Sequence, residues 1–467
     1  MMTVPQKEQG PSKPTVNTGA RLVLNITDLN HDGKGVGKHE GFTCFVTGAL
    51  PQEKVEVSIT RVRKSYAEAE LLAIIDPSPA RVQPPCPYYN SCGGCSLQHF
   101  AYDEQLKWKQ QRVYESLRRI AGIETEVRPL FGMTDPWHHR NKARIHLQGF
   151  RYGMGKQRIE AGFYEARSHR IIEVENCLIQ HPLNEKMINT VRRVLKKSAL
   201  AMKDNGLSFP LVDAVTIRAS SVENSCLVML EGKNSGFGIR TELAEIAFLI
   251  DREAEIPSAG ILWRQTGSIS KGNLLLSGKE YVIEKVASYY YRLSPVSFFQ
   301  VNPLQAQRLY ETALAMISNQ HIRTAYDIYC GTGSFTLFLS STAQKVIGVD
   351  SSASAIDDAV MNARLNNIDN IEFIKARAEE IGDLLQQGEK PKMVCLNPPR
   401  SGCSPRLLEL VSSANPEQIV YISCNPATLA RDLKLLTGKG FAVRSVQPVD
   451  MFPQTTHVET VVLIEKE

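Results

Sequence analysis

No apolar run in this 467-residue chain is long enough to cross a membrane, and no segment has the layout of a signal peptide. We therefore expect a cytoplasmic protein with no membrane partner. Without a secretion signal, the ten cysteines indicate reduced thiols, metal ligands or catalysis rather than a disulfide framework. The net charge of +5 is only mildly basic, which permits a polyanionic partner without requiring one.

The length predicts two or three domains, because one hydrophobic core rarely serves so many residues. Residues 1–19 are polar and rich in Pro, Gly and Lys, so we expect a disordered tail. Residues 20–77 alternate apolar and polar positions between turn signals, which predicts a small β-barrel. A basic cluster beside an aromatic ring suits RNA, or equally an ordinary solvated strand edge. Its members are Arg61, Arg63, Lys64 and Tyr66.

After a Pro-rich joint, residues 78–294 mix helical and strand-like stretches, as in a central α+β domain. In residues 295–467, helical patterns alternate with short apolar strands, which predicts a doubly wound, mostly parallel α/β sheet. Ligands of such sheets bind beyond the carboxyl ends of the strands. We therefore expect one cleft, lined by the loops that follow Ile328, Val349, Leu396 and Ser423.

Three of these strand ends could hold a nucleotide-like ligand. The stretch 327–335, DIYCGTGSF, contains glycines that let the backbone approach a ligand closely. Asp350 ends the next strand and is placed to accept hydrogen bonds from ribose hydroxyls. No full GxGxxG is present, so a structural turn is an alternative. A later strand ends in Asn397-Pro398-Pro399, which could grip a base or a cofactor amine, or simply end the strand.

The stretch Tyr421–Leu433 places Cys424 between a buried strand and the proline that opens a helix. A helix N-terminus favours the thiolate, the reactive form of cysteine, although most lone cysteines are structural. Glu459 lies in an otherwise apolar strand, so we expect a raised pKa, as in a proton acceptor; an exposed sheet edge is the alternative. His457 is a second candidate acid or base, or a residue that orients substrate.

Three cysteines lie close together in PPCPYYNSCGGCSLQHF, and a fourth follows far downstream in ENCLIQHP. Such a group can enclose an iron–sulfur cluster or a zinc ion. The four residues are Cys86, Cys92, Cys95 and Cys177. The spacing indicates a metal centre more strongly than it indicates which metal.

Together these residues resemble the bacterial RNA uracil-5-methyltransferase family over nearly the whole chain, and within it the iron–sulfur members that act on 23S ribosomal RNA. The resemblance implies a Rossmann-like S-adenosylmethionine-dependent methyltransferase domain. It also implies a TRAM domain, an RNA-binding barrel of the oligonucleotide-binding type, at residues 20–77, and a [4Fe–4S] cluster in the central domain. SCNPATLARDL and HVETVVL are the most specific motifs, and they imply Cys424 as nucleophile and Glu459 as base.

The resemblance also implies the ligand sites. PVSFFQVNP is similar to the family's entry motif, whose glutamine contacts S-adenosylmethionine, and here that residue is Gln300. The other cofactor residues implied are Tyr329, Gly331, Ser334, Asp350 and Asn397. The cluster ligands implied are Cys86, Cys92, Cys95 and Cys177. The family usually has aspartate before Pro-Pro-Arg, so Asn397 keeps the size and one acceptor but loses the charge.

These residue types fit methylation of carbon 5 of uracil. A thiolate that adds to carbon 6 gives carbon 5 the carbanion character needed to take a methyl group from a sulfonium donor. A base then removes the proton at carbon 5, and the thiol is eliminated. The target base must leave its stack to reach the cleft. We therefore predict a monomeric 23S rRNA (uracil-5-)-methyltransferase that forms 5-methyluridine in the rRNA or its precursor.

Three alternatives stay open. Asn-Pro-Pro also occurs in enzymes that methylate exocyclic amines, for which Cys424 would be dispensable. Asn397 alone favours a non-catalytic RNA-binding iron–sulfur protein. A transfer RNA target is opposed by the barrel and the cluster, which the family's tRNA enzymes typically lack.

Overall fold

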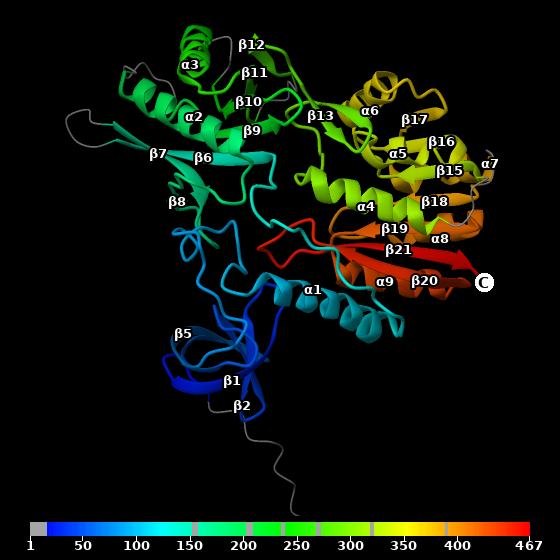
Figure 1. Cartoon of the computed structure of the whole chain (residues 1–467), viewed down its shortest axis with the longest axis horizontal. Helices are drawn as coiled ribbons and strands as arrows, with labels where there is room; N and C mark the ends of the chain where they lie inside the picture. Colours follow the sequence, from blue (N-terminus) through cyan, green and yellow to red (C-terminus); the bar gives the residue numbers. More distant parts are fainter. Residues whose placement is uncertain are drawn as a thin grey trace, which may run out of the picture. The chain divides into compact units, whose positions relative to one another are not determined.

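The computed structural model describes residues 16–151, 157–201, 209–234, 239–267, 272–317, 322–387 and 391–467 (Figure 1). They form two compact units. The first comprises the described residues up to Pro85, with Cys95–Gln105 and Gln454–Thr456, and the second comprises Cys86–Gly94, Leu106–Pro453 and His457–Glu467. None of the helices within the described ranges is long and apolar enough to cross a membrane.

Five strands of the first unit close into a barrel, in the order β1-β2-β3-β5-β4. Alternate residues point inward because successive side chains of a strand face opposite sides. The strands are β1 (Arg21–Leu29), β2 (Gly35–His39), β3 (Phe42–Thr47), β4 (Lys54–Val62) and β5 (Tyr66–Asp76). Val16 is buried against the barrel core, and the Gly19 N–H donates to the Ile59 carbonyl at 2.8 Å. The expectation of a disordered tail is therefore wrong for residues 16–19, whereas residues 1–15 lie outside the described ranges.

A distant segment of the chain completes the first unit. The Gln454 carbonyl accepts hydrogen bonds from the N–H groups of Ser96 and Leu97, at 2.9 and 3.0 Å. The side chain of buried Gln105 donates to the Gln454 side-chain oxygen at 3.0 Å. Thr456 is buried against Gly33 in the same unit. Residues 454–456 therefore belong to the barrel unit, although His457 and Glu459 follow them directly in the chain.

Most of α1 (Tyr102–Ser116), from Leu106 onward, belongs to the second unit. A short π-helical turn (Leu117–Ala121) follows it and leads to a mostly antiparallel sheet. This sheet has the order β12-β11-β10-β9-β6-β7-β8, and only β10 and β11 pair in parallel. Helices α2 and α3 cover one face of it (Figure 1). The elements are β6 (Lys142–Arg151), β7 (Gln157–Tyr164), β8 (Ile171–Ile172), α2 (Pro182–Ala201), β9 (Ala214–Ser220), β10 (Ser225–Gly232), α3 (Arg240–Glu253), β11 (Ser258–Gln265) and β12 (Leu274–Gly278).

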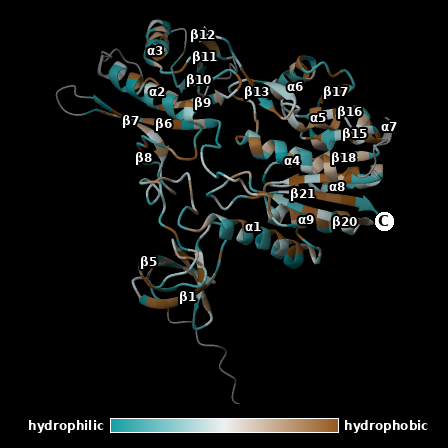
Figure 2. Cartoon of the chain, viewed as in Figure 1, coloured by the Kyte–Doolittle hydropathy of each residue, from teal (hydrophilic) through white to brown (hydrophobic). Residues whose placement is uncertain are grey.

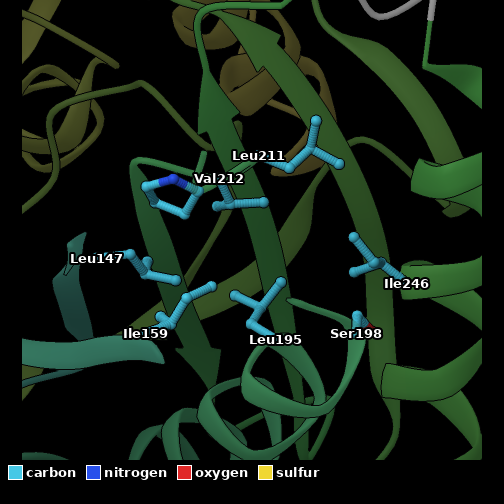
Figure 3. A pocket seen from close by; sticks show the side chains of 8 residues that line it. Leu147, Ile159, Leu195, Ser198, Leu211, Val212 and Ile246 are labelled. Carbon is cyan, nitrogen blue, oxygen red and sulfur yellow. The ribbon is translucent and has the colours of Figure 1, made fainter. Parts of the chain in front are cut away.

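The interior between this sheet and its helices is closely packed. Leu147, Ile159, Leu195 and Ile246 surround a small apolar gap (Figure 3). Its volume of about 10 Å³ is at most enough for one water molecule. The gap is therefore a packing defect and too small for a ligand.

A hairpin, β13 (Val282–Val286) and β14 (Tyr289–Leu293), leads to the C-terminal sheet of order β17-β16-β15-β18-β19-β21-β20. Strands β15 to β19 are parallel, and β21 and β20 are antiparallel additions, so the predicted doubly wound sheet is confirmed. Hydrophobic residues concentrate in its strands (Figure 2). The strands are β15 (Ile322–Ile328), β16 (Ala343–Asp350), β17 (Ile371–Lys375), β18 (Met393–Leu396), β19 (Gln418–Ser423), β20 (Phe441–Val449) and β21 (Glu459–Lys466).

Helices separate most of these strands. Asn302, Ser352, Ser404 and Asn425 cap four of them, each accepting a backbone N–H of the first turn with its side chain. Proline occupies the first turn in three of the four, where its missing N–H leaves no bond unmade. The helices are α4 (Pro303–Met316), α5 (Ser334–Leu339), α6 (Ala353–Leu365), a 3₁₀ turn (Ala378–Glu380), α7 (Gly382–Gln387), α8 (Pro405–Ala414) and α9 (Pro426–Thr437).

One buried ion pair ties α1 to the end of β20. The Lys109 ammonium lies 2.6 Å from the Asp450 carboxylate, both side chains are fully buried, and Lys109 also donates to the Phe452 carbonyl at 3.1 Å. Burial lowers the pKa of Lys109, and Asp450 opposes that shift. A buried charge that loses its partner is costly, whereas an exposed pair contributes little.

Lys109→Met should therefore lower the free energy of unfolding by about 3–5 kcal/mol, because the Asp450 charge stays buried without its lysine. The matched control is Arg119→Met. It removes a 71% exposed arginine that pairs with Glu115, one helical turn earlier, and should change stability by less than about 0.5 kcal/mol. Urea unfolding followed by tryptophan fluorescence measures both. Equal effects of the two substitutions would show that the buried pair is not an anchor.

Candidate active site

The loops that follow the parallel strands meet at one edge of the C-terminal sheet. The N–H groups of Tyr329 and Cys330 donate to the Val349 carbonyl, and the Asn397 N–H donates to the Ile328 carbonyl at 3.3 Å. Parallel strands end at the same edge, so these bonds link the segments after β15, β16 and β18. The predicted meeting of these three loops is confirmed.

The glycine turn after β15 has three residues with positive φ, and its backbone at Gly331 is not covered by atoms of the other described residues. Tyr329, Gly331 and Gly333 have φ of 68°, 56° and 75°, in the left-handed region that favours glycine. A side chain at Gly333 would press on Phe373, whereas one at Gly331 would meet no atom within 4 Å. Gly333 is thus required by packing, and Gly331 faces open space where a ligand could approach the backbone.

Asp350 is fixed at the end of β16 beside this turn. Its carboxylate accepts the Gly331 N–H at 3.0 Å and the Ser352 N–H at 2.8 Å. Asp327, on the neighbouring strand, is buried and accepts the Thr336 hydroxyl at 2.6 Å with one oxygen. Its other oxygen has no hydrogen-bond partner among the described residues, and burial raises its pKa to about 7. Such a buried, incompletely satisfied carboxyl is typical of a ligand site.

The segment 294–300 lies over the same turn. The Phe298 side chain is 71% exposed, and its carbonyl accepts the Thr332 hydroxyl at 3.5 Å. Arg218 of β9 donates to the Ser297 carbonyl at 2.6 Å, which fixes the backbone next to Phe298. Gln300 follows and is buried. Ser334, another predicted residue, opens α5, and its carbonyl accepts the Tyr291 hydroxyl at 2.9 Å.

Cys424 and Glu459 lie within electrostatic reach of each other and of Arg400. Cys424 follows the end of β19 and is half-buried, and Glu459 is the buried first residue of β21. Arg400 hydrogen-bonds the Cys424 sulfur with its side chain, and its guanidinium lies 3.2 Å from Nε2 of His457. The structure therefore brings together Cys424, Glu459 and His457, and adds Arg400 to them.

The acid–base properties of these groups differ in part from expectation. Burial raises the pKa of Glu459 to about 8 against a lowering effect of Arg400, as predicted. Burial and the nearby Glu459 raise the pKa of Cys424 to about 11, and Arg400 opposes that shift. The neutral thiol therefore prevails in the free protein, because burial and Glu459 raise its pKa more than Arg400 lowers it. That the helix N-terminus favours the thiolate stays a prediction. Burial lowers the pKa of His457 to about 4, so it is neutral at pH 7.

Arg400 was part of a recognised motif but had no predicted role. Its carbonyl accepts the Asn425 side-chain amide and the Thr428 hydroxyl, both at 3.2 Å, so α9 holds the arginine beside Cys424. Buried Asp432 accepts the Cys403 N–H at 2.8 Å and the Tyr421 hydroxyl at 2.6 Å, which ties the loop after Asn397 to β19 and α9. The sequence feature that could have identified Arg400 is its position directly after two prolines at the end of a strand.

Three of the four predicted metal ligands belong to the second unit. Cys86, Cys92 and Cys177 are half-buried free thiols within electrostatic reach of one another. Burial raises the pKa of Cys177 to about 11, and the N–H groups of Ile179 and Gln180 donate to its sulfur. Cys95 belongs to the first unit. In the described ranges, no three His, Cys, Asp or Glu side chains are grouped closely enough to hold a metal ion.

Comparison with protein families gives two matches. The model of the tRNA (Uracil-5-)-methyltransferase family matches residues 265–467, and that of the TRAM domain matches residues 16–72. The second match covers the five-stranded barrel except for the end of β5. The first covers the glycine turn, Arg400, Cys424 and Glu459.

Relatives match almost the whole chain. An uncharacterized RNA methyltransferase of Clostridium tetani is 39% identical over 94% of this chain and 95% of its own. Another uncharacterized RNA methyltransferase, of Halalkalibacterium halodurans, is 37% identical over 98% of this chain and 99% of its own. A crystal structure of Pyrococcus abyssi tRNA (uracil-54, C5)-methyltransferase in complex with S-adenosyl-L-homocysteine aligns with a TM-score of 0.70 and 27% identity, covering 95% of this chain and 100% of that one. The chain belongs to the RNA (uracil-5-)-methyltransferase family.

Proposed function

We propose that the protein transfers the methyl group of S-adenosylmethionine to carbon 5 of a uridine in 23S rRNA or its precursor, through a covalent bond between Cys424 and carbon 6. The observation that carries the proposal is the grouping of Cys424, Arg400 and Glu459 next to the glycine turn. A thiol, a cation beside it and a carboxyl with a raised pKa are the groups that this reaction needs.

The first step uses Cys424 and Arg400. The thiol loses its proton to solvent, and the Arg400 guanidinium next to the sulfur stabilises the resulting thiolate. The sulfur adds to carbon 6, and the electron pair of the carbon 5–carbon 6 bond moves into an enolate. The sulfonium cofactor, when bound, would supply the methyl group that carbon 5 takes, and would be released as the neutral thioether.

The second step uses Glu459. Its carboxylate takes the proton from carbon 5, the electrons of that bond re-form the double bond, and the sulfur of Cys424 leaves carbon 6. Since the pKa of Glu459 is about 8, the carboxyl is mostly protonated at pH 7, and its reactive fraction grows as the pH rises. Both steps need deprotonated groups, so the rate should rise with pH through the pKa of Glu459 and toward that of Cys424.

The cofactor would lie on the glycine turn. Gly331 leaves room for it, and Asp350, which accepts the Gly331 N–H, would accept hydrogen bonds from ribose hydroxyls. We assign the cofactor site to these surroundings and to the residues that the family resemblance implies: Gln300, Tyr329, Gly331, Ser334, Asp350 and Asn397. The cofactor supplies the electrophilic methyl group when bound.

We also propose that Cys86, Cys92, Cys95 and Cys177 ligate a [4Fe–4S] cluster. The C-x5-C-x2-C spacing, the mutual reach of three of the thiols and the N–H donors to the Cys177 sulfur support it. Ligands of a four-iron cluster lie farther apart than those of a single ion, because the cluster stands between them. Its role would be structural or RNA-positioning, since methyl transfer needs no electron.

A transfer RNA target is a second candidate, and the Pyrococcus abyssi structure favours it. That tRNA enzyme aligns with 95% of this chain, so a chain of this architecture is compatible with a tRNA substrate. This weakens the part of the expectation against tRNA that rests on the barrel, whereas the part that rests on the cluster stays a prediction. The cysteine spacing supports the rRNA target.

Cys424→Ala should abolish methylation, because the proposed adduct at carbon 6 is formed by the Cys424 sulfur. A strain that lacks the protein is rescued with wild type or with the variant, and 5-methyluridine is mapped by mass spectrometry in 23S rRNA and in tRNA. Loss of specific 23S marks that only wild type restores is the expected result. Loss confined to tRNA would select the second candidate, and unchanged maps would refute both.

Arg400→Gln should shift the pH–rate profile to higher pH, because Arg400 lowers the pKa of both Cys424 and Glu459. Below the pKa, each unit of increase cuts the deprotonated fraction about tenfold. The variant should therefore lose most activity at pH 7 and less at pH 9.5. Single-turnover methylation between pH 6 and 10 measures this, with Arg431→Gln, which contacts the same loop, as control. A pH-independent loss would make Arg400 a binding residue only.

Glu459→Gln should raise stability while it stops the second step. The folded protein keeps this carboxyl protonated up to about pH 8, whereas in the unfolded chain it ionises near the ordinary glutamate pKa of 4.5. Wild-type stability therefore falls as the pH rises between these two values. The variant avoids that loss, and its advantage should grow by up to about 1.4 kcal/mol per pH unit. Urea unfolding at pH 5 and pH 8 measures it. The variant should also accumulate RNA-linked protein in denaturing gels, and a constant difference in stability with pH would contradict a buried Glu459.

A further inference from the structure

The sheet of β6 to β12 has two unlike faces. Residues 143, 145 and 147 of β6 and 215, 217 and 219 of β9 are apolar and pack with α2 and α3. The alternate residues 142, 144, 146 and 148 of β6 and 216, 218 and 220 of β9 are polar or charged. Part of this second face is covered, because Arg218 reaches the 294–300 segment and Leu227 and Met229 join a core with β13 and β14. The part formed by β6 and β7 carries exposed side chains.

Pairing between the strands shows which side chains share this face. His146 pairs with Gly162 and Gln148 with Glu160 in the antiparallel β6–β7 ladder, and paired residues point to the same side. Arg144 lies opposite Thr216 of β9 in the same way. The residues that share the open face include Lys142, Arg144, His146, Gln148, Arg158, Glu160 and Tyr164.

Positive charge exceeds negative charge on this face. Glu231 is buried and contacts both Arg144 and Arg264, whose side chains are 47% and 48% exposed. Arg158 is 61% exposed, and its guanidinium lies 2.8 Å from Glu160. Burial, reinforced by Arg218 and Arg144, lowers the pKa of Lys142 to about 7, and burial and Arg144 lower that of His146. Burial is the main cause of both shifts, and the neighbouring arginines add to it.

Aromatic rings border the charges. The rings of His146 and Tyr164 are stacked with centroids 3.9 Å apart, and His169 packs edge-on against Tyr164 at 5.2 Å. His169 is exposed. Proteins that bind single-stranded RNA combine exposed cations, which contact phosphates, with rings on which unpaired bases stack.

We propose that this face, defined by Arg144, His146, Arg158, Tyr164 and Arg264, binds a single-stranded segment of the substrate RNA. The arginines contact phosphates, and the ring stack receives an unpaired base. The proposal rests on the proposed function for its partner. RNA fits better than an acidic protein, because the stacked rings of His146 and Tyr164 lie among the cations.

The test compares two double variants with the same change of charge. Arg144→Gln/Arg158→Gln removes two cations from the face, and Arg193→Gln/Lys197→Gln removes two from α2, on the other side of the sheet, where both pair with Glu253 at similar exposure. Binding of a fluorescein-labelled 30-nucleotide oligouridylate is measured by anisotropy between 50 and 400 mM KCl. Thermal unfolding of each variant is measured in parallel.

The first variant should bind about tenfold more weakly at 100 mM KCl, and its log K against log [KCl] slope should be shallower by about 1.4, or 0.7 for each lost phosphate contact. The second should bind like wild type. Equal losses in both variants would show an effect of net charge alone and overturn the proposal.

Ultraviolet crosslinking of wild-type protein to 4-thiouridine-containing RNA gives an answer that does not depend on variant folding. Adducts on peptides that contain Tyr164 or His169 are expected, and adducts confined to other peptides would overturn the proposal. Wild type that shows these adducts yet forms no 5-methyluridine would refute the proposed function and leave RNA binding by this face intact.

Discussion

The desolvation of Glu459 and Cys424 is the constraint on which this site depends. In the proposed mechanism both groups react in their charged forms, and burial disfavours those forms strongly enough to place the two pKa values at about 8 and 11. Arg400 is the cation that opposes the shift at both groups. The geometry of one arginine therefore controls how much of each group is reactive at a given pH. A lysine would not replace it equally, because the planar guanidinium can face the sulfur and the His457 ring together.

The fold holds Arg400 through hydrogen bonds between residues that are close in space but far apart in the sequence. Asp432 bonds the Cys403 N–H and the Tyr421 hydroxyl, and the first turn of α9 holds the Arg400 carbonyl. Glu459 is the first residue of β21, and this strand is held within the second unit by its pairing with β19 and β20. Small displacements of either support would alter the distance between charges, on which the pKa values depend.

Much of the architecture could be predicted because periodicity is a local property. The parallel strands of the C-terminal sheet and the meeting of its loops follow from short apolar runs separated by helices. β20 is less regular, since a bulge between Val443 and Ser445 breaks its alternation. Residues 16–19 were expected to be disordered from their polarity, yet Val16 fills the barrel core. The basic face of β6 and β7 was missed because which strands pair, and hence which cations gather, is a tertiary property.

The sign of the Cys424 shift shows where local reasoning ends. A helix N-terminus lowers a thiol pKa by a fixed, modest amount, whereas burial depends on every element that closes over the sulfur. With a pKa of about 11 the free protein holds an inert thiol at neutral pH, which also makes it a poor target for oxidants. Only about one thiol in ten thousand is ionised at pH 7. In the proposed mechanism, the thiolate comes from that small fraction, or loss of the proton is coupled to attack on carbon 6. On that mechanism, selectivity for a correctly placed uracil would follow from the same burial that suppresses the nucleophile.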